Sequence, residues 1–262
     1  MNIVAEESKM HPLVIVNADD FGMSGRVNKA VIACFKDGLV SSTTIMANMS
    51  GFDEASSLAH QYKLTGNVGI HLNLTEGKPL TDPIRKIAKF CNADGDFSFS
   101  CSNWPFFSPY EKNALALEIQ AQVELCRTCG LPLTHADSHH HIHTIIPVFS
   151  VMGPLLKKLG IYNIRIAGTL GRRSPAKKGL NRIFNYWVQS NGFHTTKYFG
   201  DIFSFMALLK KKSAFSSSID IMIHPDLDDK GTLMDSFQNY SIKPVLSSAL
   251  HGIIIEPYHL LK

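Results

Sequence analysis

The sequence predicts an α/β fold in which parallel strands alternate with helices along a chain of 262 residues. Short, continuous apolar runs such as residues 13–17 are typical of strands that are buried on both faces of a sheet. Segments with helical spacing of apolar residues, such as residues 27–35, follow these runs, and strand and helix alternate about seven times. No linker or internal repeat interrupts this alternation, so we predict one domain spanning residues 1–262. The alternation fits a barrel as well as an open sheet.

Each predicted element has its own local signal. The strands are predicted from apolar or β-branched runs at residues 13–17, 39–48, 68–75, 161–166, 195–199 and 219–226. A further strand is expected to lead into residue 134. The helices are predicted from amphipathic spacing at residues 27–35, 53–62, 112–128, 148–159, 171–190 and 202–209. Ser24 is expected to cap the first helix through its side-chain oxygen, and Gly38 is expected to end it.

Residues 76–110 follow neither the strand pattern nor the helix pattern. This stretch contains Gly77, Pro79, Gly95 and Pro105 together with several aromatic side chains. Connections of this length without regular structure are uncommon in a compact domain, and they are usually functional. We therefore predict a loop or lid insertion that shapes a substrate pocket.

The composition excludes several classes of function. The net charge is +4 and the pI is near 8.7, and no signature of a nucleic-acid-binding module accompanies the short basic clusters. Five cysteines are an odd number for a disulfide framework. No apolar run reaches the roughly 18 residues that a membrane span requires, and residues 1–10 lack the apolar core of a secretory signal. We therefore expect a cytoplasmic protein that binds neither nucleic acid nor membranes.

Residues 134–143 concentrate side chains that bind metals. Five of the twelve histidines lie within these ten residues, together with Asp137. Imidazole is a common metal ligand, and a nearby carboxylate can fix its tautomer and orientation. The alternatives are a solvated loop that is rich in histidine and a purification tag, but a tag is not expected inside a chain after a strand-like segment. The pattern favours a metal or catalytic site.

Other polar side chains lie near the ends of the predicted strands. Asp19 and Asp20 follow the first strand, and two adjacent carboxylates at such a position are costly unless they meet water, a metal or another cation. His71, Arg165 and His224 lie within or after later strands. Because the carboxyl ends of parallel strands form sites in β/α folds, we expect these residues to meet the histidine-rich stretch.

One aspartate and two histidines can bind a divalent cation and leave coordination positions open for water and substrate. A second carboxylate beside the metal can take a proton from water, and a histidine from another strand can protonate a leaving group. Such a set performs metal-assisted hydrolysis of an amide, an ester or a phosphoester. The residue types alone do not choose among these substrates.

Four ordered motifs resemble those of the YdjC family. They are residues 16–22 (VNADDFG), 69–80 (GIHLNLTEGKPL), 134–143 (THADSHHHIH) and 222–225 (MIHP). This family includes chitooligosaccharide deacetylases of the ChbG type, and a hopanoid-pathway deacetylase is a relative. The resemblance extends in order from about residue 13 to the C-terminus, and four ordered motifs are more specific than any one of them.

The resemblance implies a single-domain (β/α) barrel-like deacetylase fold, which is a distorted TIM-type barrel of about seven strands. It also implies a divalent metal, usually Mg²⁺ with Zn²⁺ as the alternative, bound by Asp20, His71 and His139. Asp19 matches the general base and His224 the general acid. The implied reaction removes an acetyl group from an N-acetylglucosamine unit of a small chitooligosaccharide or a related acetylated carbohydrate. The resemblance implies a homodimer as well.

Three further residues are expected to support this site. Asp137, His141 and Arg165 are predicted to bind substrate or to orient a metal ligand. For Arg165, a buried structural ion pair is the alternative.

Two other functions stay open at the level of sequence. The first is a metal-dependent phosphoesterase, for which Arg165, Arg172 and Arg173 would have to supply positive charge. The second is a metal-binding or sugar-binding homologue with impaired catalysis. That alternative depends on Asp226, which follows the His-Pro where the family commonly has glycine and adds a charge beside the expected general acid.

Overall fold

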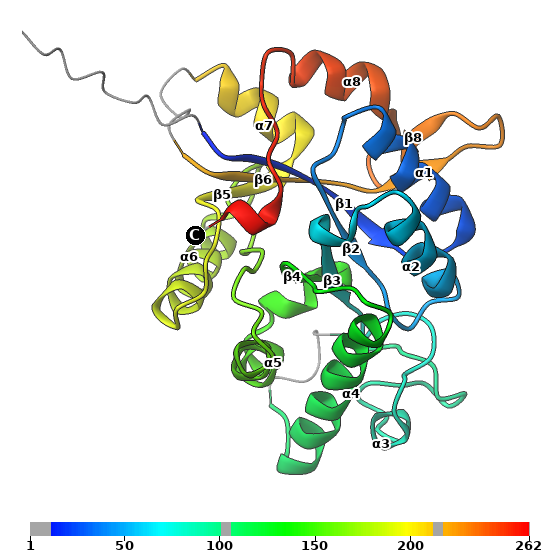
Figure 1. Ribbon diagram of the computed structural model, residues 1–262. Coiled ribbons are helices and arrows are strands. Elements are labelled where there is room, and N and C mark those ends of the chain that lie inside the picture. The colour runs from blue at the N-terminus through cyan, green and yellow to red at the C-terminus, as the bar shows by residue number, and fades with distance from the viewer. Residues whose placement is uncertain (1–11, 101–105, 212–216, 262) are drawn as a thin grey trace, which may run out of the picture.

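The main sheet has six strands, all parallel, in the order β4-β3-β2-β1-β6-β5 (Figure 1). The computed structural model describes residues 12–100, 106–211 and 217–261, so residues 1–10, where no secretory signal is expected, lie outside the described residues. The strands are β1 (Val14–Phe21), β2 (Ser42–Ile45), β3 (Val68–Leu72), β4 (Ala136–Ser138), β5 (Tyr198–Asp201) and β6 (Ile219–Ile223). Because β1 lies between β2 and β6, its carboxyl end is central to the edge where the strands finish.

Helices surround this sheet (Figure 1). In the described part of the chain they are α1 (Gly25–Lys36), α2 (Phe52–Gln61), α3 (Asp82–Arg85), α4 (Pro109–Thr128), α5 (Ile146–Lys158), α6 (Pro175–Ser190), α7 (Ile202–Leu209) and α8 (Ile242–Ala249). Each helix predicted from amphipathic spacing is present. The predicted cap is confirmed as well, because the Ser24 side chain accepts a hydrogen bond from the backbone N–H of Val27 at 3.2 Å. None of the helices in these ranges is long and apolar enough to cross a membrane.

The sheet curls into a half-barrel, which confirms the barrel-like α/β fold expected from the sequence (Figure 1). Residues between its edge strands extend the curl. Ile164 forms an isolated parallel bridge to Ala136 of β4, and Asn163 forms one to His194, shortly before β5. The strand predicted at residues 161–166 is present only as these bridges. β4 has just three residues, which leaves little edge for a longer ladder.

A small antiparallel sheet continues directly from β6. It consists of β7 (Pro225–Leu227), β8 (Leu233–Asp235) and β9 (Tyr240–Ser241), in that order. The single strand predicted at residues 219–226 is therefore two strands that belong to different sheets. His224 lies at the junction between them, where it is not part of either ladder.

The predicted insertion at residues 76–110 has little regular structure where it is described. Before α4 begins it contains the short helix α3 and an isolated bridge between Cys91 and Phe97. The rings of Phe90, Phe99 and Phe107 pack together, with centroids 5.5, 5.2 and 6.2 Å apart. Residues 101–105 lie outside the described residues. These rings belong to the main hydrophobic core, so the insertion packs against the rest of the domain, and its role as a lid stays a prediction.

Candidate metal and catalytic site

The adjacent aspartates Asp19 and Asp20 both reach the site because the end of β1 is irregular. Neighbouring residues in a regular strand point to opposite faces of the sheet. Here the register between β1 and β2 shifts between Ala18 and Phe21, and Asp20 has a left-handed φ of 67°. That φ is uncommon for a residue other than glycine, and such strain clusters at functional sites. The irregularity therefore places two carboxylates where a regular strand would place one.

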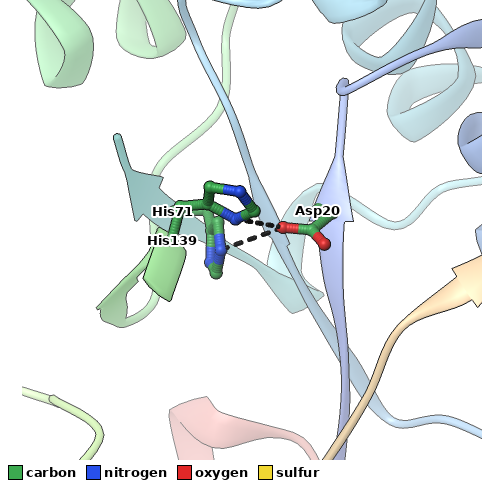
Figure 2. A group of neighbouring side chains, drawn as sticks. All are labelled: Asp20, His71 and His139. Atoms are coloured by element: carbon green, nitrogen blue, oxygen red, sulfur yellow. Dashed lines mark hydrogen bonds and ion pairs between the residues drawn. The ribbon is translucent and has the colours of Figure 1, made fainter. Parts of the chain in front are cut away.

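Asp20, His71 and His139 form a compact cluster at the carboxyl ends of β1, β3 and β4 (Figure 2). Oδ1 of Asp20 lies 3.1 Å from Nε2 of His71 and 2.9 Å from Nδ1 of His139. All three residues are buried. One carboxylate and two imidazoles, whose ligand atoms lie within 4.8 Å of one another, are a donor set that binds a divalent cation. We call these three residues the inner cluster.

The electrostatics of the inner cluster fit a cation. Burial raises the pKa of Asp20, but the hydrogen bonds with His139 and His71 outweigh it and hold the pKa well below its ordinary value. Burial lowers the pKa of His71, but the charge of Asp137 and the hydrogen bonds to Asp137 and Asp20 raise it to about 10. The chain without a metal thus carries a proton on His71 between two carboxylates. A divalent cation would replace that proton, because an imidazole ligand must be neutral.

Asp137 holds His71 from the side opposite Asp20. β3 and β4 pair with His71 directly opposite Asp137, and Oδ1 of Asp137 lies 2.6 Å from Nδ1 of His71. The hydroxyl of Thr44 on β2 lies 3.1 Å from the same nitrogen and donates to Oδ2 of Asp137 at 3.2 Å. These contacts leave Nε2 of His71 facing Asp20. A carboxylate behind an imidazole is the arrangement that orients metal ligands, which is one of the two roles predicted for Asp137.

Arg165 is fully buried and enclosed by carboxylates. Its Nη1 lies 2.6 Å from Oδ2 of Asp19 and 2.5 Å from Oδ2 of Asp137, while its Nε lies 2.8 Å from Oδ2 of Asp220. The ring of Phe199 covers the guanidinium at 4.8 Å. Burial raises the pKa of Asp19, but Arg165 outweighs it and holds the pKa below its ordinary value, so Asp19 is an anion at neutral pH. Arg165 thus forms a buried ion-pair network, which was the alternative to substrate contact.

Asp220 and Tyr258 were not predicted from the sequence, although both support Arg165. The hydroxyl of Tyr258 donates to Oδ2 of Asp220 at 2.5 Å, and its ring stacks on His135 at 3.8 Å with an angle of 7° between the planes. A carboxylate inside the otherwise apolar strand β6 is a signal that could have identified Asp220. Tyr258 has no such signal, because it lies near the C-terminus, 38 residues from its partner.

His224 faces Asp19 from the junction of β6 and β7. Its Nε2 lies 3.9 Å from Oδ2 of Asp19, and its Nδ1 lies 4.0 Å from Oδ2 of Asp235. The backbone N–H of His224 donates to the same Asp235 oxygen at 2.9 Å. Its side chain is 19% exposed, whereas that of Asp19 is 1% exposed. His224 is therefore the member of this pair that a substrate can reach.

The carboxylate of Asp226 is paired with a cation from another element. Its Oδ2 lies 2.7 Å from Nη2 of Arg26 on α1, and its Oδ1 accepts a hydrogen bond from the backbone N–H of Leu227. Arg26 therefore compensates the charge that the sequence placed beside His224. Sequence reasoning could not anticipate this pair, because its members are 200 residues apart.

The histidine-rich stretch turns sharply after β4, which sends its side chains to different places. His140 and His141 have left-handed φ angles of 52° and 55°. The ring of His141 meets that of Phe199 at 5.6 Å, and burial together with the charge of Arg165 lowers its pKa to about 3. His143 is fully buried and contacts the hydroxyl of Ser138 at 2.6 Å. Within this stretch, His139 is the histidine that joins the inner cluster.

Comparisons with known proteins give a consistent result. The family model described as YdjC-like protein matches residues 13–248. A carbohydrate deacetylase of Clostridium beijerinckii is 30% identical over 242 residues, which cover 87% of this chain and 86% of that relative. A chitooligosaccharide deacetylase of Yersinia pestis is 32% identical over 232 residues, which cover 87% of this chain and 86% of that relative. A crystal structure of a protein from Enterococcus faecalis V583 that is named for cellobiose-phosphate cleavage superposes on this chain with a TM-score of 0.73. The superposition covers 96% of this chain and 100% of the other chain. At 22% identity, that likeness supports the fold alone.

Proposed function

The chain belongs to the YdjC-like protein family, and on that premise we propose that it is a metal-dependent carbohydrate N-deacetylase. Its proposed substrates are the N-acetylglucosamine units of small chitooligosaccharides or a related acetylated carbohydrate. Relatives named carbohydrate deacetylase and chitooligosaccharide deacetylase support this substrate class. The observation that carries the proposal is the position of the inner cluster beside Asp19 and His224. Amide hydrolysis needs a polarised carbonyl, a base and an acid, and these residues supply all three.

Asp20, His71 and His139 would hold the cation. When bound there, a divalent cation supplies an activated water and polarises the carbonyl oxygen of the amide. Mg²⁺ is the ion that the family resemblance implies. Two imidazoles among three ligands suit Zn²⁺ better, because Mg²⁺ prefers oxygen ligands. Titration of the purified chain with each ion decides between them.

Asp19 and His224 take the two proton-transfer roles. Arg165 binds both oxygens of Asp19, and Asn17 donates to Oδ1 at 2.8 Å, so the carboxylate is fixed in place and ionised. Asp19 accepts the proton that water loses as it attacks the carbonyl carbon. His224 donates a proton to the amide nitrogen as the C–N bond breaks, which releases the free amino sugar and acetate. Oδ2 of Asp19 lies 3.9 Å from Nε2 of His224, so the proposed base and the proposed acid are neighbours in the site.

The buried position of Arg165 argues against a phosphoesterase. That alternative needs Arg165, Arg172 and Arg173 to bind a phosphate group. Arg165 has no exposed side-chain surface and pairs with three carboxylates. Arg173 donates to the backbone carbonyl of Leu170. Two of the three cations are therefore engaged within the protein.

An exposed aromatic ring beside His224 offers a surface for a sugar. Phe237 is 73% exposed, and its ring lies 5.4 Å from that of His224. The apolar face of a sugar ring can stack on an exposed aromatic ring, and the contact with His224 places this ring at the proposed acid. The next residue along the chain, Gln238, lines a cavity of about 670 Å³ together with Thr169 and Asp201. This cavity has both polar and apolar lining and is large enough for further sugar units of an oligosaccharide.

An acetate-release assay tests the proposed function. The purified chain is incubated with Mg²⁺ or Zn²⁺ and with di-N-acetylchitobiose, other acetylated sugars and acetylated lipids. We expect acetate from di-N-acetylchitobiose or a related sugar. Phosphate release from a generic phosphoester, without acetate from any acetylated compound, would favour the phosphoesterase. Binding of metal and sugar without turnover would indicate the catalytically impaired homologue. The homodimer and the cytoplasmic location stay predictions, which a single chain does not test.

A further inference from the structure

Three acceptor groups meet at the solvent side of the inner cluster. Oε1 of Glu76 lies 3.4 Å from Nε2 of His139 and 3.9 Å from Nε2 of His140. The ligand atoms of these three residues lie within 4.8 Å of one another. The side chains of Glu76 and His140 are 39% and 58% exposed, and that of His139 is 9% exposed. We call Glu76, His139 and His140 the outer cluster, which shares the His139 ring with the inner cluster.

Partly buried hydrogen bonds hold the backbone of Glu76 in position. The side-chain amide of Asn73 donates to the backbone carbonyl of Glu76 at 2.7 Å, and that of Asn48 donates to the same carbonyl at 3.0 Å. The backbone N–H of Glu76 donates in turn to Oδ1 of Asn73 at 3.2 Å. Asn73 is itself fixed, because Gln122 on α4 bonds both its N–H and its carbonyl oxygen. The carboxylate of Glu76 therefore extends from an anchored turn.

The hydroxyl of Thr75 engages one ring nitrogen of His140. It lies 3.0 Å from Nδ1 of His140. The other ring nitrogen, Nε2, lies 3.9 Å from Oε1 of Glu76. This contact leaves Nε2 as the nitrogen of His140 that faces Glu76.

The ring of His139 faces both clusters. Its Nδ1 lies 2.9 Å from Oδ1 of Asp20. Its Nε2 is buried and, among the described residues, has no hydrogen-bond partner. Two imidazole nitrogens and a carboxylate oxygen therefore lie close together on the outer side, and they are a donor set that binds a divalent cation.

We propose that Glu76, His139 and His140 form a second, outer site for a divalent cation of the Zn²⁺ type. The two sites exclude one another, because His139 faces the inner cluster with Nδ1 and the outer cluster with Nε2, and a neutral imidazole offers one lone pair at a time. The outer cluster thus holds a cation at the exposed side of the inner cluster. The mutual exclusion of the two sites rests on the inner metal site of the proposed function.

Zn²⁺ binding to the purified full-length chain tests the proposal, measured by calorimetric titration with melting curves to verify folding. The double variant Asp20→Asn/His71→Gln removes two inner ligands, and the amide oxygen introduced by Asp20→Asn still accepts the hydrogen of His139. The single variant Asp20→Asn serves if the double variant does not fold. Glu76→Gln or His140→Asn is then added to the variant that folds. Asparagine tolerates the left-handed backbone of position 140. The matched control is His251→Asn, because His251 is also exposed.

We expect the wild type to bind one Zn²⁺ and the variant without the inner site to bind one Zn²⁺ more weakly. Adding Glu76→Gln or His140→Asn should weaken that remaining binding at least tenfold, whereas His251→Asn should leave it unchanged. A folded inner-site variant that binds no Zn²⁺ would overturn the proposal. Equal binding with and without Glu76→Gln and His140→Asn would overturn it too, as would two Zn²⁺ ions on the wild type. Failure of acetate release alone would affect the proposed function and not this site.

Discussion

Two parts of the site differ in what holds them in place. The arginine network consists of Asp19, Asp137, Arg165 and Asp220. The rim consists of Glu76, His140, His224 and Phe237. Every member of the arginine network is buried, and each carboxylate pairs with the same guanidinium. The members of the rim are partly exposed, and Phe237 at 73% is the most open of them.

This difference separates stability from function. A charge buried among opposite charges loses its compensation when one partner is removed, whereas a partly exposed group is solvated in its place. Substitutions in the arginine network should therefore change folding and chemistry together. Substitutions on the rim should change binding or turnover while the protein stays folded. The following substitutions test that separation.

The largest effect is expected for Arg165→Met. The substitution leaves three buried carboxylates without their common cation, and removing one partner of a buried ion pair costs roughly 3–5 kcal/mol. We expect the free energy of unfolding in urea to fall by at least that amount, with loss of acetate release. The control Arg172→Met, at an exposed position, should stay within about 0.5 kcal/mol of the wild type. An Arg165→Met protein as stable as the wild type would show that the network does not support the fold.

Asp137→Asn should weaken metal binding in addition to the loss of stability expected for a member of the arginine network. Asparagine keeps the shape of the side chain but loses the negative charge that faces Nδ1 of His71. Loss of a carboxylate that orients an imidazole ligand typically lowers metal affinity by roughly 10-fold to 100-fold. Calorimetric titration with Zn²⁺ measures this loss, and the exposed Asp82→Asn is the matched control. Unchanged affinity would remove Asp137 from the metal site.

On the rim, His224→Asn should lower kcat by roughly 100-fold or more, the usual size of a general-acid contribution. Its side chain is 19% exposed and lies outside the inner cluster, so Zn²⁺ affinity and thermal stability should stay at the wild-type level. Steady-state kinetics on di-N-acetylchitobiose give the comparison. A loss of stability as large as that of Arg165→Met would erase the distinction between network and rim.

The smallest effect is expected for Phe237→Ala. If the exposed ring supports a sugar by stacking, its removal raises KM by up to about tenfold with little change in kcat, because uniform binding is lost. Leu180→Ala on α6, where the side chain is 63% exposed, is the control. An unchanged KM would place the sugar elsewhere.

The predicted strands and helices follow from local patterns, and the elements that differ depend on tertiary contacts. Apolar runs identified β1, β3 and β6 because those strands are buried on both faces. The small sheet of β7, β8 and β9 was not predicted, since strands of two or three residues carry too short a pattern. The segment at residues 161–166 has a strand-like composition. It forms only isolated bridges to Ala136 and His194, because neither neighbouring segment is extended for long enough to form a ladder with it.

The site residues also divide into those that local patterns predict and those that depend on tertiary contacts. Alternation of strands and helices was enough to expect Asp20, His71 and His139 near one another, since each lies at or near the end of a parallel strand. That Asp19 and Asp20 both reach the site depends on a register shift that no local pattern indicates. Asp220 and its partner Tyr258 depend on the packing of the C-terminal segment. Electrostatic compensation between distant residues is therefore the part of the site that the sequence did not reveal.

The most direct test compares the two adjacent aspartates. Asp19→Asn and Asp20→Asn are each assayed for acetate release from di-N-acetylchitobiose and for Zn²⁺ affinity. Asp19→Asn should keep metal affinity near the wild-type level, because its carboxylate faces Arg165, yet lose acetate release by roughly 10²-fold to 10⁴-fold. Asp20→Asn should abolish acetate release and also lower the Zn²⁺ affinity at least tenfold, because the Asp20 carboxylate faces both histidines. Wild-type acetate release by Asp19→Asn, or equal loss of metal in both variants, would contradict the assignment of base and ligand.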